Sequence, residues 1–220
     1  MRMRRKAERA GDDAATTPTG ESAASDAVEP ELGPFDVDEV DEGDLPPVDL
    51  GSLMVAPMPG ANLRVQVEEK TQTVRSVLLT GESGAVELRA YAAPRNGDLW
   101  GEIRPQIAAD TARRGGTATE REGTFGTELL CEIRVKRSDG VQGTQVSRVV
   151  GVNGPRWLLR ATFLGDPARQ PESAAAWEEA VRKVVVRRGT HAMPVGEQLP
   201  ITMPEGAQQV QPAQKPPADR

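Results

Sequence analysis

The sequence has one cysteine and one histidine, and this excludes several kinds of site. Cys131 has no second cysteine with which to form an internal disulfide or a cysteine-based zinc site. It lies in the apolar alternation Leu129–Cys131–Ile133, which predicts a buried, inert thiol. His191 follows the last expected helix in a stretch with Pro and Gly, so a Cys–His pair or a Ser–His–Asp triad has little support. We therefore predict no catalytic residue, no metal site and no cofactor.

Long apolar runs and phosphate-binding loops are also missing. No run of about 18 apolar residues exists to span a membrane, and the basic start leads into polar sequence rather than a signal peptide. We therefore expect a cytoplasmic protein without a membrane-spanning segment. The sequence contains no GxxxxGK[ST], no GxGxxG after a strand and no GxSxG. These absences argue against nucleotide-binding and hydrolase folds.

Basic residues are absent from residues 11–50, which carry thirteen acids. Residues 1–10 have five basic side chains and one acidic one, and residues 51–220 have 22 basic and 19 acidic side chains. The formal net charge of -6 therefore arises in the leading arm and says little about a ligand of the domain.

Composition divides the chain into four parts. Residues 1–32 have almost no large apolar side chain, which predicts a disordered arm. We interpret residues 33–50 as an acidic strap with apolar anchors, 51–189 as a single domain, and 190–220 as a proline-rich tail. Six of the seven aromatic residues lie between 91 and 177, which places the dense core there.

The strap differs from a solvated linker because apolar side chains are spaced among its acids. Pro46 and Pro47 disfavour a helix and favour extended backbone. A linker gains nothing from apolar side chains, so we predict that the strap docks on the domain or on a partner. Its candidate contacts are Phe35, Val37, Val40, Leu45 and Leu50.

Hydrophobic alternation in the domain predicts strands joined by glycine-containing turns such as GESG, EGTFG, SDG and VNGP. The last contains Asn–Gly between two apolar runs, a strong hairpin signal. The expected strands are 53–56, 63–67, 73–80, 85–92, 117–122, 128–137, 142–152 and 156–164.

Two helices are expected, at about 98–114 and 172–187. Asp98 or Asn96 is the candidate N-cap of the first, and Pro105 should either kink it or mark its first turn. The order of strands, helix, strands and helix predicts an α+β fold, with an antiparallel sheet of about six to eight strands covered by two main helices.

The segments GPFDVDEVD, DLGSLMVAPMPG, GDLWGEI, GVNGPRWLLRATF and WEEAVRKVVVRRG resemble an uncharacterised actinobacterial family, over roughly residues 33–204. Its members tend to be encoded near the dUTPase gene, and the resemblance implies no catalytic residue. A looser likeness, carried by Trp100, the following strands and the Trp177 helix, is to the PsbP-like α/β/α sandwich. That fold serves mostly binding and assembly factors, so the likeness implies a binding role.

The second candidate surface is a sheet face bearing arginines. Arg134, Lys136, Arg148 and Arg160, together with Arg156, would form a positive platform if they share the exposed face. The acidic strap could then fold back over that face until a partner replaces it.

Our leading hypothesis is a non-enzymatic binding or scaffolding module with a protein partner. The alternatives are an enzyme with an unrecognised carboxylate or arginine pocket, and a factor that associates weakly with nucleic acid and is linked to nucleotide metabolism. Acidic pairs such as Asp98 and Glu102 are the candidate catalytic carboxylates, with a solvated helix face as the ordinary interpretation.

Overall fold

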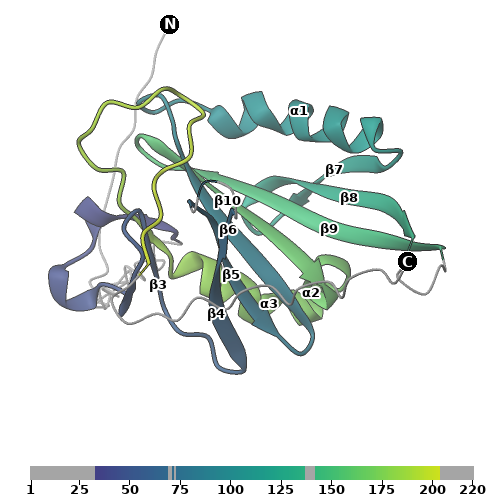
Figure 1. The fold of residues 1–220 in the computed structure, drawn as a ribbon, viewed down its shortest axis with the longest axis horizontal. Helices are drawn as coiled ribbons and strands as arrows, with labels where there is room; N and C mark the ends of the chain where they lie inside the picture. The colour runs from purple at the N-terminus through teal and green to yellow at the C-terminus, as the bar shows by residue number, and fades with distance from the viewer. Residues whose placement is uncertain (1–32, 69–70, 72, 137–141, 204–220) are drawn as a thin grey trace, which may run out of the picture. The chain divides into compact units, whose positions relative to one another are not determined.

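The computed structural model describes residues 33–68, 71, 73–136 and 142–203. The predicted N-terminal arm, the SDG turn and the last part of the predicted tail lie outside the described residues. The described chain has an α+β fold, with most of its regular structure in two sheets and its longer helices packed against the larger one (Figure 1).

All eight strands expected in the domain are present, with ends that differ by a few residues. Three very short strands are added: β1, β2 and β11. The strands are β1 Phe35–Asp36, β2 Val48–Asp49, β3 Leu53–Val55, β4 Ala61–Val67, β5 Val74–Gly81, β6 Gly84–Ala92, β7 Thr117–Gly123, β8 Gly126–Lys136, β9 Gln142–Asn153, β10 Trp157–Gly165 and β11 Val185–Val186.

The main sheet has seven strands in the order β4-β5-β6-β10-β9-β8-β7, and its neighbouring strands are antiparallel to each other. β10 returns beside β6, so the strands before and after the first helix are joined into one sheet. The prediction of a single antiparallel sheet of six to eight strands is therefore confirmed for these seven.

The strap and two short segments form a second sheet that the sequence analysis missed. Its order is β1-β11-β3-β2, with β1 parallel to β11 and the other pairs antiparallel. Two short 3-10 helices, Val37–Glu39 and Glu42–Asp44, lie between β1 and β2. The segment 53–56, expected in the main sheet, belongs here instead.

The first long helix, α1 Leu99–Arg113, begins where predicted, and the Asp98 side chain caps it by accepting a hydrogen bond from Gly101 N. Pro105 lies inside the helix on an exposed side, so the prediction that it could mark the helix start is wrong. The cap at Asp98 fixes the start upstream of Pro105.

The last helices also differ from the prediction. A short helix, α2 Asp166–Arg169, precedes α3 Pro171–Arg182, and the chain from 183 to 187 is not helical. Val185 and Val186 instead pair with β1 and β3 as β11 and are buried. β-branched side chains suit a strand better than a helix, and the neighbouring strap supplies a pairing edge that local sequence does not reveal.

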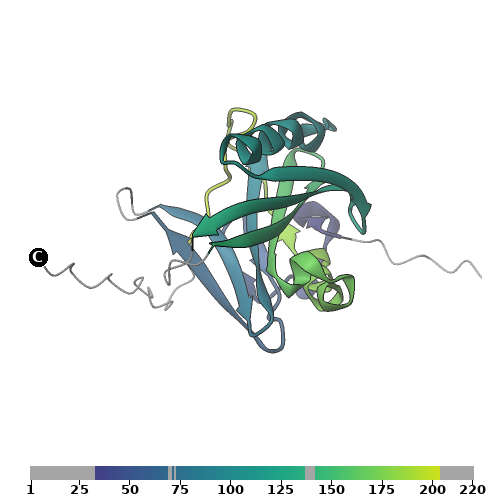
Figure 2. The ribbon, with the colours of Figure 1, turned by 90° about the vertical axis from the view of Figure 1, so that its right-hand side faces the viewer.

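The two faces of the main sheet carry different helices (Figure 2). On one face, α3 packs Trp177 and Val181 onto Leu88, Leu159 and their neighbours in the larger core. On the other face, α1 packs Leu99 and Trp100 against Leu129, Cys131 and Val149 of β8 and β9. We call these the α3 face and the α1 face.

Two residues of the predicted proline-rich tail, Leu199 and Ile201, are buried in the larger core. Leu199 is fully buried and its N–H donates to Ala90 O at 2.8 Å. Gln198 bridges to Tyr91 and Ile201 bridges to Val74, so the segment fills the edge between β6 and the start of β5.

Candidate binding surface

The sheet register shows which side chains share the α1 face, because directly opposed residues of antiparallel strands point the same way. Glu87 and Tyr91 of β6 lie opposite Thr162 and Leu158 of β10, and all four project to this face. α1 contacts β7, β8 and β9, whereas no comparable contact joins it to β4, β5 or β6. We call the part formed by β4, β5, β6 and β10 the open face.

The open face carries Arg64, Arg89 and Arg160 on three of its strands. Arg89 of β6 lies directly opposite Arg160 of β10, an unfavourable pairing of like charges unless an anion offsets it. Glu87 neutralises Arg89, with 2.6 Å between Glu87 Oε1 and Arg89 Nη2. Arg160 instead lies over the Tyr91 ring, 5.2 Å from its centroid. Arg64 of β4 is exposed and, like Arg160, has no ion-pair partner among the described residues.

A groove of about 220 Å³ separates the open face from α1. Ile103 and Ile107, one helical turn apart, supply its apolar wall from α1, and both are only partly buried. Tyr91 and Arg160 line it from the sheet. The remaining lining residues are Leu99, Gln106, Asp110 and Gly196.

The position of α1 beside this groove is set at its first turn. Asn153, at the end of β9, accepts a hydrogen bond from Trp100 N and donates one to Asp98. The Trp100 indole lies against Gly151, where any side chain would collide with it, and donates to Thr127 O at 2.7 Å. These bonds hold the helix over β8 and β9 and leave the neighbouring strand β10 at the edge of the groove.

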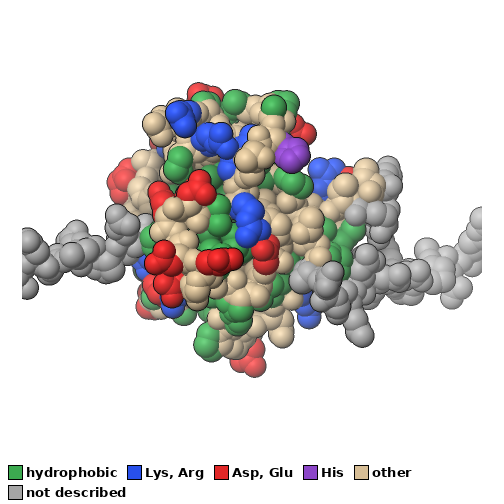
Figure 3. Space-filling view, turned by 90° about the vertical axis from the view of Figure 1, so that its left-hand side faces the viewer, with side chains coloured by type: hydrophobic (Ala, Val, Ile, Leu, Met, Phe, Trp, Pro, Cys, Tyr) green, Lys and Arg blue, Asp and Glu red, His purple; other side chains and the backbone are tan. Residues whose placement is uncertain are grey.

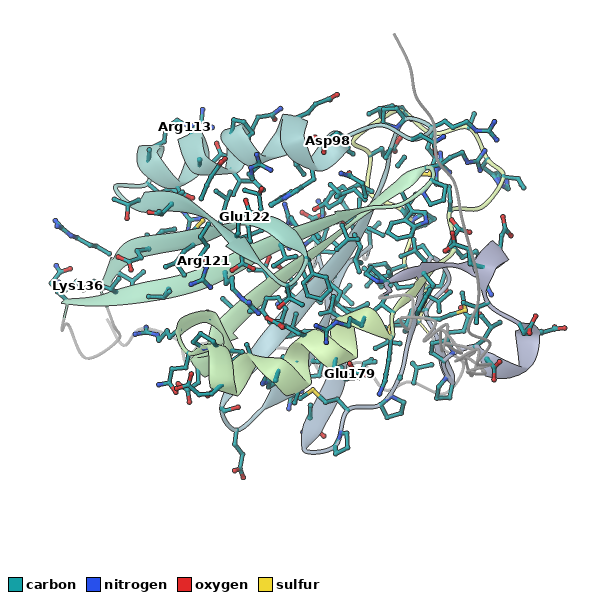
Figure 4. The ribbon with its side chains drawn as sticks, turned by 180° about the vertical axis from the view of Figure 1, so that it is seen from behind. Asp98, Arg113, Arg121, Glu122, Lys136 and Glu179 are labelled. Atoms are coloured by element: carbon teal, nitrogen blue, oxygen red, sulfur yellow. The ribbon has the colours of Figure 1, made fainter. Side chains whose placement is uncertain are left out.

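The Asp98 carboxylate accepts two hydrogen bonds in this turn, and they lower its pKa. The hydrogen bond from Gly101 N has the largest effect and that from Asn153 the next largest, and together they hold the pKa of Asp98 below its usual range. Asp98 and Glu102 were the candidate catalytic carboxylates, and a lowered pKa suits a cap rather than a general acid. Figure 4 shows Asp98 at one end of α1 and Arg113 at the other.

The strap docks on its own domain. Leu50 is fully buried in the larger core, and Phe35, Val37, Val40 and Leu45 are half-buried. Because all five candidate contacts are at least partly covered by the chain itself, the strap's apolar anchors serve the fold, and Leu50 is inaccessible to a partner.

Specific polar contacts fix the strap at both ends. Near its start, Trp157 Nε1 donates to the buried Asp36 Oδ2 at 2.6 Å. Near its end, Arg187 Nη1 lies 2.8 Å from Asp49 Oδ2. These contacts and the strand pairs place the strap beside β3 and β11, so the hypothesis that it covers Arg134, Lys136, Arg148 and Arg160 is not supported.

The outer side of the strap is acidic. Asp38, Asp41, Glu42 and Asp44 are exposed, and none has an ion-pair partner within the described ranges. Figure 3 shows Asp and Glu side chains gathered on the side of the molecule where the strap lies. A shallow cleft of about 410 Å³ adjoins it, lined by Pro34, Glu39, Asn96, Gly97, Asn153, Gly154, Pro155 and Trp157.

Arg148 belongs to a buried ion network on the α3 face. Its Nη1 lies 2.6 Å from Glu178 Oε1 and 3.5 Å from Glu128 Oε2, and its guanidinium stacks 4.2 Å from the Phe163 centroid. Arg121 pairs with Glu128 at 2.7 Å. Glu178 of α3 is buried, so its ion pair with Arg148 ties α3 to β9.

The predicted positive platform does not form from the predicted residues. Arg134 and Lys136 are exposed on the α3 face, whereas Arg160 lies on the α1 face and Arg148 is only 5 % exposed. Figure 4 places Lys136 at the far end of β8, away from α1's first turn. Arg156 donates to Gly189 O in a loop. Of the residues proposed for this platform, only Arg160 takes part in the open face.

Sequence reasoning missed Arg64, Arg89, Tyr91, Ile103 and Ile107 as members of one surface. A partial signal exists, because Glu87, Arg89 and Tyr91 alternate with buried Val86, Leu88 and Ala90. That alternation shows an outward face on β6. The pairing of β6 with β10, which brings Arg160 beside Arg89, depends on contacts far apart in the sequence.

Displaced pKa values among the described residues belong to four carboxyl groups, one arginine and one cysteine. The carboxyl groups with a displaced pKa are Asp49, Glu68, Asp98 and Glu179, and each is displaced downwards. Burial raises the pKa of the Cys131 thiol, in agreement with the predicted inert cysteine. Within the described ranges, no group of three or more His, Cys, Asp or Glu could hold a metal ion. None of the described helices has the length and apolar character needed to cross a membrane.

Comparison with known proteins agrees with the expectation of an uncharacterised family. No curated protein matches the chain. A family model described as "Protein of unknown function (DUF3710)" matches residues 33–210, which include the strap, both sheets and the open face. The chain therefore belongs to the DUF3710 family.

Proposed function

We propose that the protein is a non-enzymatic binding module that holds an acidic segment of a protein partner on its open face. The observation that carries the proposal is the placement of Arg160 directly opposite Arg89, with only Glu87 to offset the two charges. With Arg64, the open face has three arginines and one glutamate on neighbouring strands. Such a surface attracts a carboxylate-rich partner and disfavours a basic one.

The shapes of the described clefts favour binding over catalysis. An enzyme site would bring acids, bases or arginines together in a concave pocket with a displaced pKa. The larger cleft has Glu39 as its one ionisable lining residue, and the groove beside α1 is lined by Tyr91, Arg160 and an Asp110 that pairs with Arg113. Neither arrangement provides an acid and a base that face a common reacting atom.

A protein partner fits the open face better than nucleic acid. Single-stranded nucleic acid binding uses several aromatic rings as a stacking platform along a basic groove. The open face offers Tyr91, whose ring is already covered by the Arg160 guanidinium. The positive charge of the face is also interrupted, because Glu87 lies among its arginines and pairs with Arg89.

The test measures binding of the full-length protein to short polyglutamate by calorimetry at low and physiological salt. The variant Arg64→Gln/Arg89→Gln/Arg160→Gln removes the open-face charges. A matched control, Arg95→Gln/Arg134→Gln/Lys136→Gln, removes the same number of charges from exposed sites elsewhere. Thymidine oligonucleotide is the competing probe.

We expect polyglutamate affinity to fall at least tenfold in the open-face variant, to change little in the control and to weaken with salt. Equal loss in the two variants would show that binding reports net charge alone and would overturn the proposal. Tighter binding of the oligonucleotide than of polyglutamate would replace the protein partner with nucleic acid.

Three further expectations from the sequence concern the location, the family and the fold of this module. We propose that the module acts in the cytoplasm and that its family is actinobacterial, with members encoded near the dUTPase gene. The likeness to the PsbP-like sandwich supports a binding role, since helices lie on the two faces of an antiparallel sheet here as well.

A further inference from the structure

We infer that the groove between α1 and β10 is a specificity pocket, which accepts an apolar side chain adjacent to an acidic residue of the bound segment. This inference rests on the proposed function and names the sequence class of the partner. The relevant segment carries an aliphatic residue for the wall of Ile103 and Ile107 and a carboxylate for Arg160.

The apolar wall is the first step of the argument. Ile103 and Ile107 pack against the smaller core yet stay partly exposed, side by side on one face of α1. Val195 is the large apolar side chain that is most exposed among the described residues, at 56 %, and it lies outside the groove. Ile103 and Ile107 thus form an apolar wall of the groove beside the open face. A ligand side chain that fills the groove would remove apolar area of this wall from water.

The charges around the groove give the second step. Asp110, the one acid in the lining, pairs with Arg113 at the end of α1. Arg160 is the one cation in the lining, and it pairs with no carboxylate of the described chain. Its contact with the Tyr91 ring holds the guanidinium over an aromatic surface, where water solvates one side of it less well. A ligand carboxylate would complete this arrangement.

The position of Arg160 links the pocket to the open face. Arg160 both lines the groove and stands opposite Arg89, so a single bound segment can place one side chain in the groove while its acids continue over Arg89 and towards Arg64. The volume of about 220 Å³ suits one or two side chains rather than a helix. An extended acidic segment with interspersed aliphatic residues is the occupant that this geometry favours.

Fluorescence anisotropy with three matched synthetic peptides tests the inference on the full-length protein. The first peptide contains Asp, Leu and Gly. The second has each Leu replaced by Ser with the charge unchanged, and the third has each Asp replaced by Asn. Ile107→Ser and Ile103→Ser alter the apolar wall, Val195→Ser is the control at an exposed apolar site, and circular dichroism checks folding.

We expect the Leu peptide to bind about tenfold more tightly than the Ser peptide, because one side chain leaves water in the groove. That preference should shrink in Ile107→Ser and Ile103→Ser and persist in Val195→Ser. The Asn peptide should bind poorly to every form of the protein.

Two other results would count against the inference in different ways. Equal binding of the Leu and Ser peptides, both weakened by the open-face variant, would overturn the pocket while leaving the acidic partner in place. If the open-face variant bound both peptides as tightly as the unmodified protein does, the pocket and the proposed function would be overturned together. The comparison of peptides on the unmodified protein settles the question even if a serine variant fails to fold.

Discussion

Three arginines of the described chain show how the surroundings of a guanidinium decide what it can do. Arg148 is buried, paired with two glutamates and stacked on Phe163, so it holds α3 to the sheet. Arg187 pairs with Asp49 and fixes the strap. Arg160 is partly exposed and pairs with no described carboxylate, which leaves its charge available to a ligand.

The cap of α1 provides a residue-scale prediction of stability and its pH dependence. Asp98→Ala should lower the free energy of unfolding by about 1 kcal/mol at pH 7, because Gly101 N loses its acceptor at the helix start. Since the folded pKa of Asp98 lies below its ordinary value of 3.8, this stabilisation is present above that pH and disappears as pH falls through the folded pKa. Urea unfolding at pH 7 and at decreasing pH measures both effects.

Asp110→Ala is the control for this prediction. Asp110 is exposed on the same helix and pairs with Arg113, so its loss should change stability by no more than about 0.5 kcal/mol. A loss for Asp98→Ala that is no larger than that for Asp110→Ala, or that stays constant at acid pH, would contradict the cap's assigned role.

Strands and helices of the main sheet were predictable because each carries its own pattern. The alternation of β6 and the Asn–Gly turn between β9 and β10 are local signals, and both elements formed as expected. The small sheet was not predictable, since β1, β2 and β11 are two residues each and form only because the strap lies beside Val185 and Val186. Because the hydrophobic periodicity continues beyond Arg182, the sequence predicted a helix to about residue 187, whereas α3 ends at Arg182.

The candidate site was predictable only in part for the same reason. Arg160 was named from sequence, but the basic residues named with it do not share its face of the sheet. The outward parity of Arg89 can be read from β6, whereas its position opposite Arg160 requires knowledge that β10 returns beside β6. The apolar anchors of the strap were recognised as anchors, and the structure shows that they dock on the domain itself.

The strap gives an element-scale prediction. Leu50→Ala should lower the free energy of unfolding by about 2–5 kcal/mol, because a fully buried leucine of the larger core is replaced by a cavity. Val195→Ala, at an exposed site, should change it by no more than about 0.5 kcal/mol. Chemical unfolding measures both variants, and a Leu50→Ala value as small as the control would mean that the strap contributes little to the fold.

At the scale of the whole described domain, the two faces of the sheet differ in what covers them, and our proposal assigns binding to one of them. The α3 face carries the larger core and the ion network of Arg148, which stabilise the fold, and leaves Arg134 and Lys136 exposed near the end of β8. On the α1 face, α1 covers β7, β8 and β9, and the open face beside it carries Arg64, Arg89 and Arg160 next to a groove with one apolar wall. The acidic outer side of the strap lies elsewhere, and like charges there would disfavour the acidic partner that we propose for the open face.

The most direct test of this division is a map of where an acidic ligand binds. Backbone amide signals of the ¹⁵N-labelled full-length protein are followed by nuclear magnetic resonance during titration with short polyglutamate. The account predicts shifts at Arg64, Arg89, Tyr91 and Arg160, with smaller ones along α1 at Ile103 and Ile107. Shifts confined to Arg134 and Lys136 on the opposite face, or no shifts at all, would contradict it.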